Sequence, residues 1–147
     1  MNMKAKCCCG GASANPCGDC TGTQDAITLE TDASSCSCQV LDGGTNTIPY
    51  LTFDDLPLWC EWLWQRSANV CADGYGEVTV AITCSKSTGK WNVYVSRGVQ
   101  TPQYKVENLD ASTFQCIGGK IVGSASAAGQ SVSYGANCTG LTATVTI

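Results

Sequence analysis

Apolar and polar residues alternate along several stretches of the chain, and the clearest alternation covers residues 77–84. In that stretch one side of an extended chain carries Val78, Val80, Ile82 and Cys84. Successive side chains of a β-strand point to opposite faces, so this period of two predicts a strand with one buried face.

Residues 90–97 repeat the pattern, with Trp91, Val93 and Val95 on one face. Between the two stretches lies the turn-forming sequence SKSTG. Two alternating stretches joined by a short loop that contains glycine are typical of a β-hairpin. We therefore expect residues 77–97 to form a hairpin whose apolar face lies in the core.

Weaker strand patterns recur elsewhere, at residues 26–31, 46–53, 103–109, 119–125 and 141–147. Pro49 has no backbone N–H, which confines its stretch to a sheet edge or a bulge. Residues 123–137 are small and polar, so we expect a long surface loop there. Seven or eight short strands separated by turns favour an all-β fold, an antiparallel β-sandwich that forms a single domain over residues 26–147.

One segment is ambiguous between a helix and a strand, residues 54–67. Asp55 stands where an N-cap would lie and Pro57 falls in the first turn, which favours one short helix. The alternative is a further strand. In that case one face would carry Cys60, Trp62 and Trp64.

The chain contains twelve cysteines in 147 residues, a density that is typical of disulfide-stabilised proteins. The disulfide candidates are Cys7, Cys8, Cys9, Cys17, Cys20, Cys36, Cys38, Cys60, Cys71, Cys84, Cys116 and Cys138. Neighbouring cysteines cannot readily bond to each other, so the adjacent triplet needs separate partners. Seven candidates precede residue 40 and five follow it, and both numbers are odd. Complete pairing within one chain therefore requires at least one bridge between the two groups, which would pin a cysteine- and glycine-rich arm, residues 1–25, to the sandwich.

Metal and redox chemistry are the alternatives for these thiols. Cys17 and Cys20 have zinc-ligand spacing, and Cys36 with Cys38 would complete a tetrahedral site. The second pair lacks the usual two-residue spacer, and the later cysteines are scattered singly through strand patterns. A thioredoxin-type site would need the CGDC motif at a helix N-terminus, and no such unit is apparent. We favour disulfides, with no metal and no cofactor.

Enzymatic activity is not expected. The chain contains no histidine, which removes the usual general base and the triads built on it. Asp54 and Asp55 are adjacent carboxylates, a pattern more typical of a helix cap than of a glycosidase pair. The net charge is -4 with scattered lysines and arginines, which argues against a nucleic-acid partner. No apolar run of about 18 residues is present, so no membrane-spanning segment is expected.

Three tryptophans occur within six residues, namely Trp59, Trp62 and Trp64. Bulky aromatic residues usually fill a core. The alternative is a stacking platform for sugars, as in a carbohydrate-binding or adhesin-like extracellular module.

The cysteine framework resembles that of small cysteine-rich β-domain proteins of tailed bacteriophages. The matching stretches are CCCG…CGDC, then CSC, then VAITC followed by KWNVYV, and a last cysteine before TATVTI. The resemblance implies a virion structural protein, a capsid decoration or tail-associated subunit, whose partners are copies of itself and other particle or filament subunits.

The beginning of the chain agrees with that expectation. The basic start MNMKAK is followed by cysteine and glycine rather than by the apolar core of a signal peptide. We therefore expect synthesis in the host cytoplasm, oxidation after lysis, and a final location on the virion surface. Arm contacts with a neighbouring subunit, including an intersubunit disulfide from Cys7, Cys8 or Cys9, are part of this hypothesis.

Overall fold

The computed structural model describes residues 20–32, 44–67, 76–97, 101–131 and 139–147. Within these residues the chain forms ten β-strands and no α-helix. The strands are β1 (Ile27–Thr31), β2 (Gly44–Ile48), β3 (Tyr50–Asp55), β4 (Trp59–Ser67), β5 (Glu77–Ser85), β6 (Trp91–Arg97), β7 (Tyr104–Leu109), β8 (Phe114–Ile117), β9 (Lys120–Gly129) and β10 (Thr142–Thr146). The all-β expectation is confirmed.

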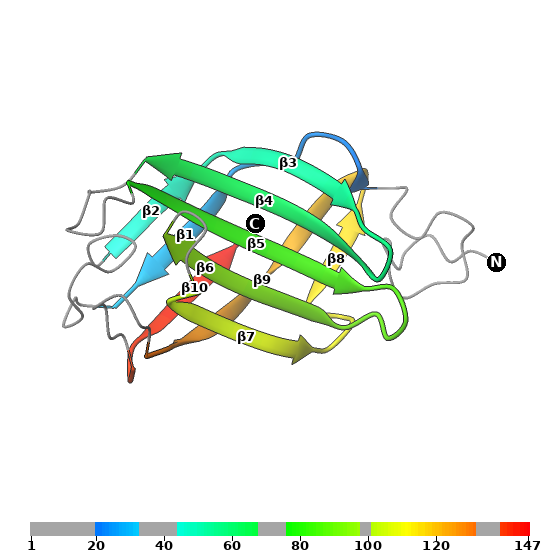
Figure 1. Cartoon of the computed structure of the whole chain (residues 1–147). Helices are drawn as coiled ribbons and strands as arrows, with labels where there is room; N and C mark the ends of the chain where they lie inside the picture. Colours follow the sequence, from blue (N-terminus) through cyan, green and yellow to red (C-terminus); the bar gives the residue numbers. More distant parts are fainter. Residues whose placement is uncertain (1–19, 33–43, 68–75, 98–100, 132–138) are drawn as a thin grey trace.

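The strands form one antiparallel sheet in the order β2-β1-β10-β9-β7-β6-β5-β4-β3, and β8 pairs with β9 outside this path. The two ends of the path, β2 and β3, are separated in the chain by Pro49 alone. The chain itself thus joins the two end strands, and the sheet curls into a nearly closed, flattened barrel. In Figure 1 the front strands β3 to β7 cross the back strands β1, β9 and β10, as the strand tilt of a barrel requires.

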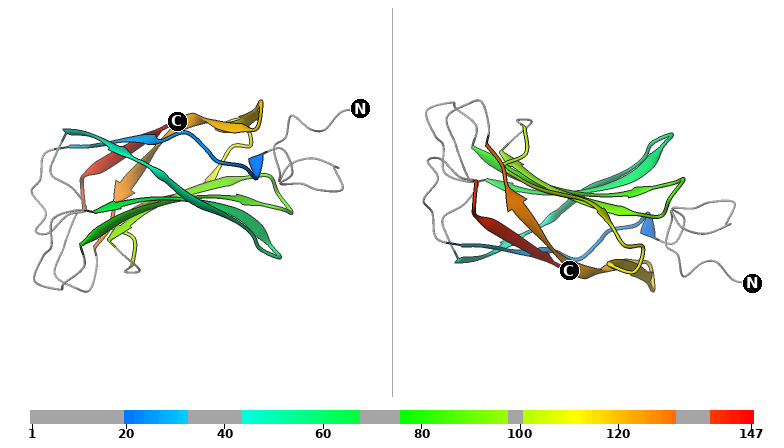
Figure 2. Two further views of the ribbon diagram at one scale, coloured as in Figure 1. Left: turned by 90° about the horizontal axis from the view of Figure 1, so that it is seen from above. Right: turned by 90° about the horizontal axis from the view of Figure 1, so that it is seen from below.

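Between β2 and β3, drawn in cyan in Figure 2, the chain passes from one layer of the flattened barrel to the other. Pro49 is the one residue between these two strands. Proline has no N–H, but its carbonyl accepts a hydrogen bond of 3.1 Å from the backbone N–H of Gln65. The guanidinium of Arg66 also donates to the carbonyl of Thr47, at 3.3 Å. Pairing with β4 shifts register between Tyr50 and Thr52. The expectation of a bulge or edge at Pro49 is confirmed.

The predicted β-sandwich is not confirmed, because a sandwich has two separate sheets, whereas here one continuous series of paired strands runs from β2 to β3 and gives a barrel-like fold. The seam between β7 and β9 is short, with register partners Tyr104–Gly129 and Lys105–Ala128. The end strands β2 and β3 are not paired with each other, so the barrel is nearly rather than completely closed. Because the barrel is flattened, its strands lie in two layers, as the strands of a sandwich do.

The predicted hairpin at residues 77–97 is confirmed as β5 and β6. Its strands are paired from Val78–Arg97 to Cys84–Trp91. Every expected inward side chain is buried, as are those of the neighbouring β4. An aromatic row crosses the interior, in which Trp62 and Trp91 have ring centroids 5.7 Å apart and Trp91 lies 5.4 Å from Phe114. Phe53 extends the row on the other side of Trp62, at 5.2 Å.

Residues 54–67 do not form a helix. Leu56 donates its backbone N–H to the carbonyl of Trp59, which makes a tight β3–β4 turn around Pro57. The chain then runs as β4, with Cys60, Trp62 and Trp64 fully buried. Asp55 and Pro57 favour a helix start locally, but burial of the Trp62 and Trp64 indoles outweighs them. These two residues lie two positions apart, so a strand directs both side chains into the barrel.

The expected loop at residues 123–137 is also wrong in its first half. β9 continues to Gly129, with Ala125 and Ala127 facing inward. Small side chains conceal the alternation in the sequence, and pairing with β10 supplies the missing stabilisation. Residues 132–138 lie outside the described part of the chain.

The short strand β8 was not expected from the sequence, and its hairpin with β9 depends on close backbone approach. Gly123 has φ +151°, and a Cβ there would lie 2.3 Å from the carbonyl oxygen of Thr113. Only glycine fits such a position without a shift of the chain.

Candidate functional site

A disulfide joins Cys20, in the segment before β1, to Cys116 in β8, with 6.0 Å between the Cα atoms. The two residues are 96 positions apart in the sequence. The predicted bridge between the early cysteines and the later ones is confirmed at this pair. Cys60 and Cys84 are disulfide-bonded as well.

Eight further disulfide candidates lie outside the described residues. These are Cys7, Cys8, Cys9, Cys17, Cys36, Cys38, Cys71 and Cys138. The alternative of a zinc site that includes Cys20 is not compatible with this structure, because Cys20 is bonded to Cys116 and is therefore not a thiolate ligand. Among the described residues no group of three or more cysteine, aspartate or glutamate side chains is placed to hold a metal ion.

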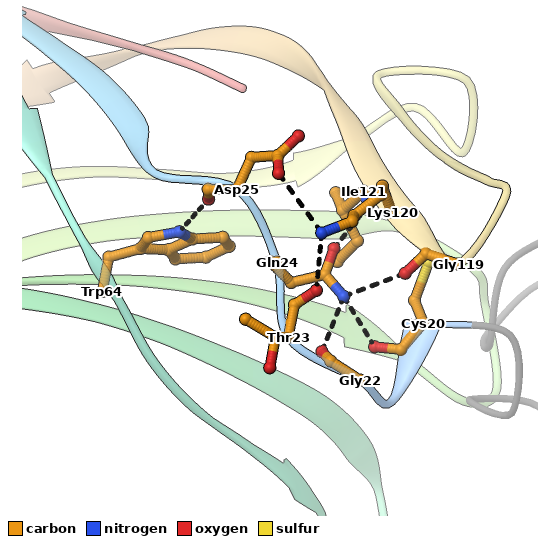
Figure 3. Close-up of polar contacts among 9 residues, drawn as sticks. All are labelled: Cys20, Gly22, Thr23, Gln24, Asp25, Trp64, Gly119, Lys120 and Ile121. Atoms are coloured by element: carbon orange, nitrogen blue, oxygen red, sulfur yellow. Dashed lines mark hydrogen bonds and ion pairs between the residues drawn. The ribbon is translucent and has the colours of Figure 1, made fainter.

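Gln24 ties the segment that follows Cys20 to the β8–β9 hairpin (Figure 3). Its amide nitrogen donates to the carbonyls of Cys20, Gly22 and Gly119, at 3.3, 2.9 and 3.1 Å. Its amide oxygen accepts from the backbone N–H of Ile121 at 2.6 Å. One buried side chain thus satisfies backbone groups nearly a hundred residues apart.

Lys120 and the buried tryptophans strengthen the same junction. The Lys120 ammonium donates to the carbonyl of Thr23 at 3.0 Å and to the carboxylate of Asp25 at 3.2 Å (Figure 3). The indole N–H of Trp64 donates to the carbonyl of Asp25 at 2.9 Å, and that of Trp62 donates to the carbonyl of Cys20 at 2.7 Å. The segment at residues 20–25 is therefore joined to the barrel by covalent and polar contacts together.

The three clustered tryptophans do not form one ligand platform. Trp62 and Trp64 point into the barrel and are completely buried, whereas Trp59 lies on the outer face with 41 % of its surface exposed. The core interpretation is correct for the first two. Trp59 alone remains available to a ligand, because the alternation of β4 places odd-numbered residues outside.

Trp59 borders a hollow of about 610 Å³ on the outer face of β4, β5 and β6. Residues of the β3–β4 and β5–β6 turns contribute to its lining. The lining residues are Pro57, Leu58, Trp59, Glu61, Thr83, Ser85, Lys86, Ser87, Asn92 and Tyr94.

A polar row crosses the floor of this hollow. Strand register places Glu61 of β4 beside Thr83 of β5, and Thr83 beside Asn92 of β6. The Asn92 amide donates to the Thr83 hydroxyl at 3.0 Å, and its oxygen accepts from the backbone N–H of Asn108, also at 3.0 Å. These bonds hold Thr83 and Asn92 in fixed orientations.

The electrostatic character of the hollow is acidic. Burial raises the pKa of Glu61, and repulsion from the Asp54 carboxylate makes a smaller contribution in the same direction. Burial and a hydrogen bond to Glu107, of 2.7 Å, raise the pKa of Tyr94. The Lys86 ammonium at the rim is held in an ion pair with Asp55.

The sequence contains each of these residues but gives no sign that they meet, because the row depends on the register of three strands. Among the described residues, no helix has the length and apolar character needed to cross a membrane. Comparisons with protein-family models, curated proteins and solved structures find no match to the chain.

Proposed function

We propose that the protein is a non-enzymatic structural component of a bacteriophage virion, displayed on the capsid or tail surface. The observation that carries the proposal is the bonding state of the cysteines. All four within the described residues are in disulfides, and one of these closes a loop spanning 96 positions. Such bonds persist outside a reducing cytoplasm, which suits a particle that is released by lysis.

The surface near the Cys20–Cys116 bridge supports assembly with further subunits. Ile117 and Val122 belong to the β8–β9 hairpin that receives the N-terminal segment, and they are 57 % and 36 % exposed. Apolar side chains at such a position would be covered in a particle. The contacts envisaged are with copies of the chain or with other particle subunits, and they require neither a membrane nor a nucleic acid.

The test is to purify particles from a host that carries the gene, and to measure the protein in them by quantitative mass spectrometry and gold-labelled antibody. We expect a fixed copy number per particle. Ile117→Lys should lower that number, whereas Leu51→Lys, which changes an exposed residue of β3, should leave it unchanged. Protein that is abundant in the lysate and absent from washed particles would refute the proposal.

A further inference from the structure

The hollow on the outer face lies apart from the disulfide and from the junction at Gln24, and its chemistry suits a small ligand. We propose that it binds a neutral or amine-bearing saccharide, with one sugar ring stacked on Trp59. Three features argue for this ligand: an exposed indole on a hydrogen-bonded backbone, a polar row beside it, and the sign of the charge around both.

The backbone that carries the indole is held in place by hydrogen bonds. The carbonyl of Trp59 accepts from the N–H of Leu56, and the carbonyl of Leu58 accepts from the N–H of Lys86, both at 3.0 Å. The two rim turns are thereby joined. An exposed aromatic face with electron density above the ring attracts the C–H groups of a pyranose, which carry partial positive charge.

The polar row offers hydrogen-bonding groups at the edge of such a ring. Within the described residues nothing donates a hydrogen bond to the carboxylate of Glu61, although this side chain is only partly exposed. The Thr83 hydroxyl and the Asn92 amide are already oriented by their mutual bond. A half-buried acceptor beside oriented polar groups is suited to the hydroxyl or amine donors of a sugar.

The surrounding charge selects among sugars. Glu61 lies on the floor of the hollow, where the negative charge of Asp54 on β3 repels its carboxylate. Glu107 on β7 places a further negative charge beside Tyr94. Lys86 is the cation among the lining residues, and Asp55 already neutralises it. A uronic or sialic acid would therefore meet unfavourable charge, whereas a neutral sugar or a hexosamine would not. The volume of about 610 Å³ is within the usual range for small-ligand sites.

Tryptophan fluorescence gives a direct test, because Trp59 is the exposed one of four tryptophans and the other three are buried. The probes are oligomers of glucose, of N-acetylglucosamine and of glucosamine, with polygalacturonate and sialyllactose as acidic counterparts. We expect at least one neutral or amine-bearing oligomer to protect the fluorescence from acrylamide quenching in a saturable way. Calorimetry on the oxidised protein should give the same affinity.

Two variants separate the stacking from the polar contribution. Trp59→Ala should weaken binding on the order of tenfold or more, the loss of an aromatic contact. Glu61→Gln should weaken binding of glucosamine oligomers more than that of glucose oligomers. Leu51→Ala, an exposed apolar residue outside the hollow, is the matched control and should bind like the parent.

Three results would overturn the proposal. One is the absence of saturable binding by all neutral and amine-bearing probes. Another is a Trp59→Ala protein that melts at the parent's temperature and binds the sugar with the parent's affinity. The third is a preference for the acidic probes over the neutral and amine-bearing ones.

Discussion

Gln24 uses both ends of its amide inside the protein, so its removal leaves several backbone groups without partners. The side chain is 3 % exposed and contacts Gly119 and Ile121 across the junction. We predict that Gln24→Ala lowers the free energy of unfolding by about 1–3 kcal/mol, the cost of unsatisfied buried polar groups. Urea unfolding under oxidising conditions measures this.

The matched control is Gln115→Ala, which removes the same chemical group from an exposed position on β8. We expect a change within about 0.5 kcal/mol for the control. Gln24→Glu should be at least as damaging as Gln24→Ala, because a carboxylate cannot donate to three carbonyls. Equal midpoints for Gln24→Ala and the control would show that the junction does not depend on this amide.

Tyr104 gives a prediction for alkaline pH. Burial, with a smaller contribution from Asp32, raises its pKa from the usual 10.0 to about 12. The folded state therefore holds the phenolic proton more tightly than the unfolded state does. The resulting contribution to stability is complete below pH 10 and is lost as the pH rises through 12.

Urea midpoints measured between about pH 8 and pH 12 should fall for the parent, and fall less steeply for Tyr104→Phe. The slope of the urea midpoint against pH is compared, since the substitution also changes the stability at neutral pH. Parallel slopes for the two proteins would mean that other groups, such as Tyr94, account for the alkaline loss.

At the scale of elements, the period-two pattern of β5 determines which substitutions are tolerated. Val80 is completely buried, and the side chain of its neighbour Thr79 faces outward. We predict that Val80→Asp abolishes soluble folded protein, because it buries a carboxylate without a partner. Thr79→Asp should cost roughly 1 kcal/mol or less, a difference in strand propensity.

Soluble yield and circular dichroism distinguish these two outcomes. If Val80→Asp melts like the parent, the strand register is wrong by one residue. The comparison with Thr79→Asp matters because it adds the same charge to the same strand on its other face.

The strand patterns show how far the sequence can predict elements. β1, β5, β6 and β10 were predictable, because large apolar residues alternate with polar ones within a single stretch. β9 was not, since alanine and serine differ too little in hydropathy to reveal an inner face. β4 was ambiguous because Pro57 and Asp55 favour a helix start as readily as a tight turn, and only packing of Trp62 decides between them.

At the scale of the whole molecule, the Cys20–Cys116 disulfide restricts the unfolded chain more than the folded one. For a separation of 96 residues the entropic contribution is about 4–5 kcal/mol. We predict that Cys20→Ser combined with Cys116→Ser lowers the free energy of unfolding toward that amount. Denaturant unfolding of the oxidised double variant provides the measurement.

A second measurement separates the bond from the contacts around it. Limited proteolysis of the double variant should cleave near residues 20–25 faster than in the parent, even though Gln24 and Lys120 keep their partners. A double variant that unfolds at the parent's midpoint and resists cleavage would show that the polar contacts alone hold the segment.

The sequence by itself determined the all-β class, the buried faces of the strongest strands, and the need for a bridge between early and late cysteines. The first two properties follow from the local alternation of apolar and polar residues, and the third follows from counting the cysteines. None of them depends on which strands pair with each other. The tertiary structure alone decided that the sheet curls into a nearly closed barrel whose end strands meet at Pro49, that Trp59 separates from Trp62 and Trp64, and that Glu61, Thr83 and Asn92 share one row. Closure and register arise from pairing between distant strands, whose partners a one-dimensional pattern of hydrophobicity does not specify.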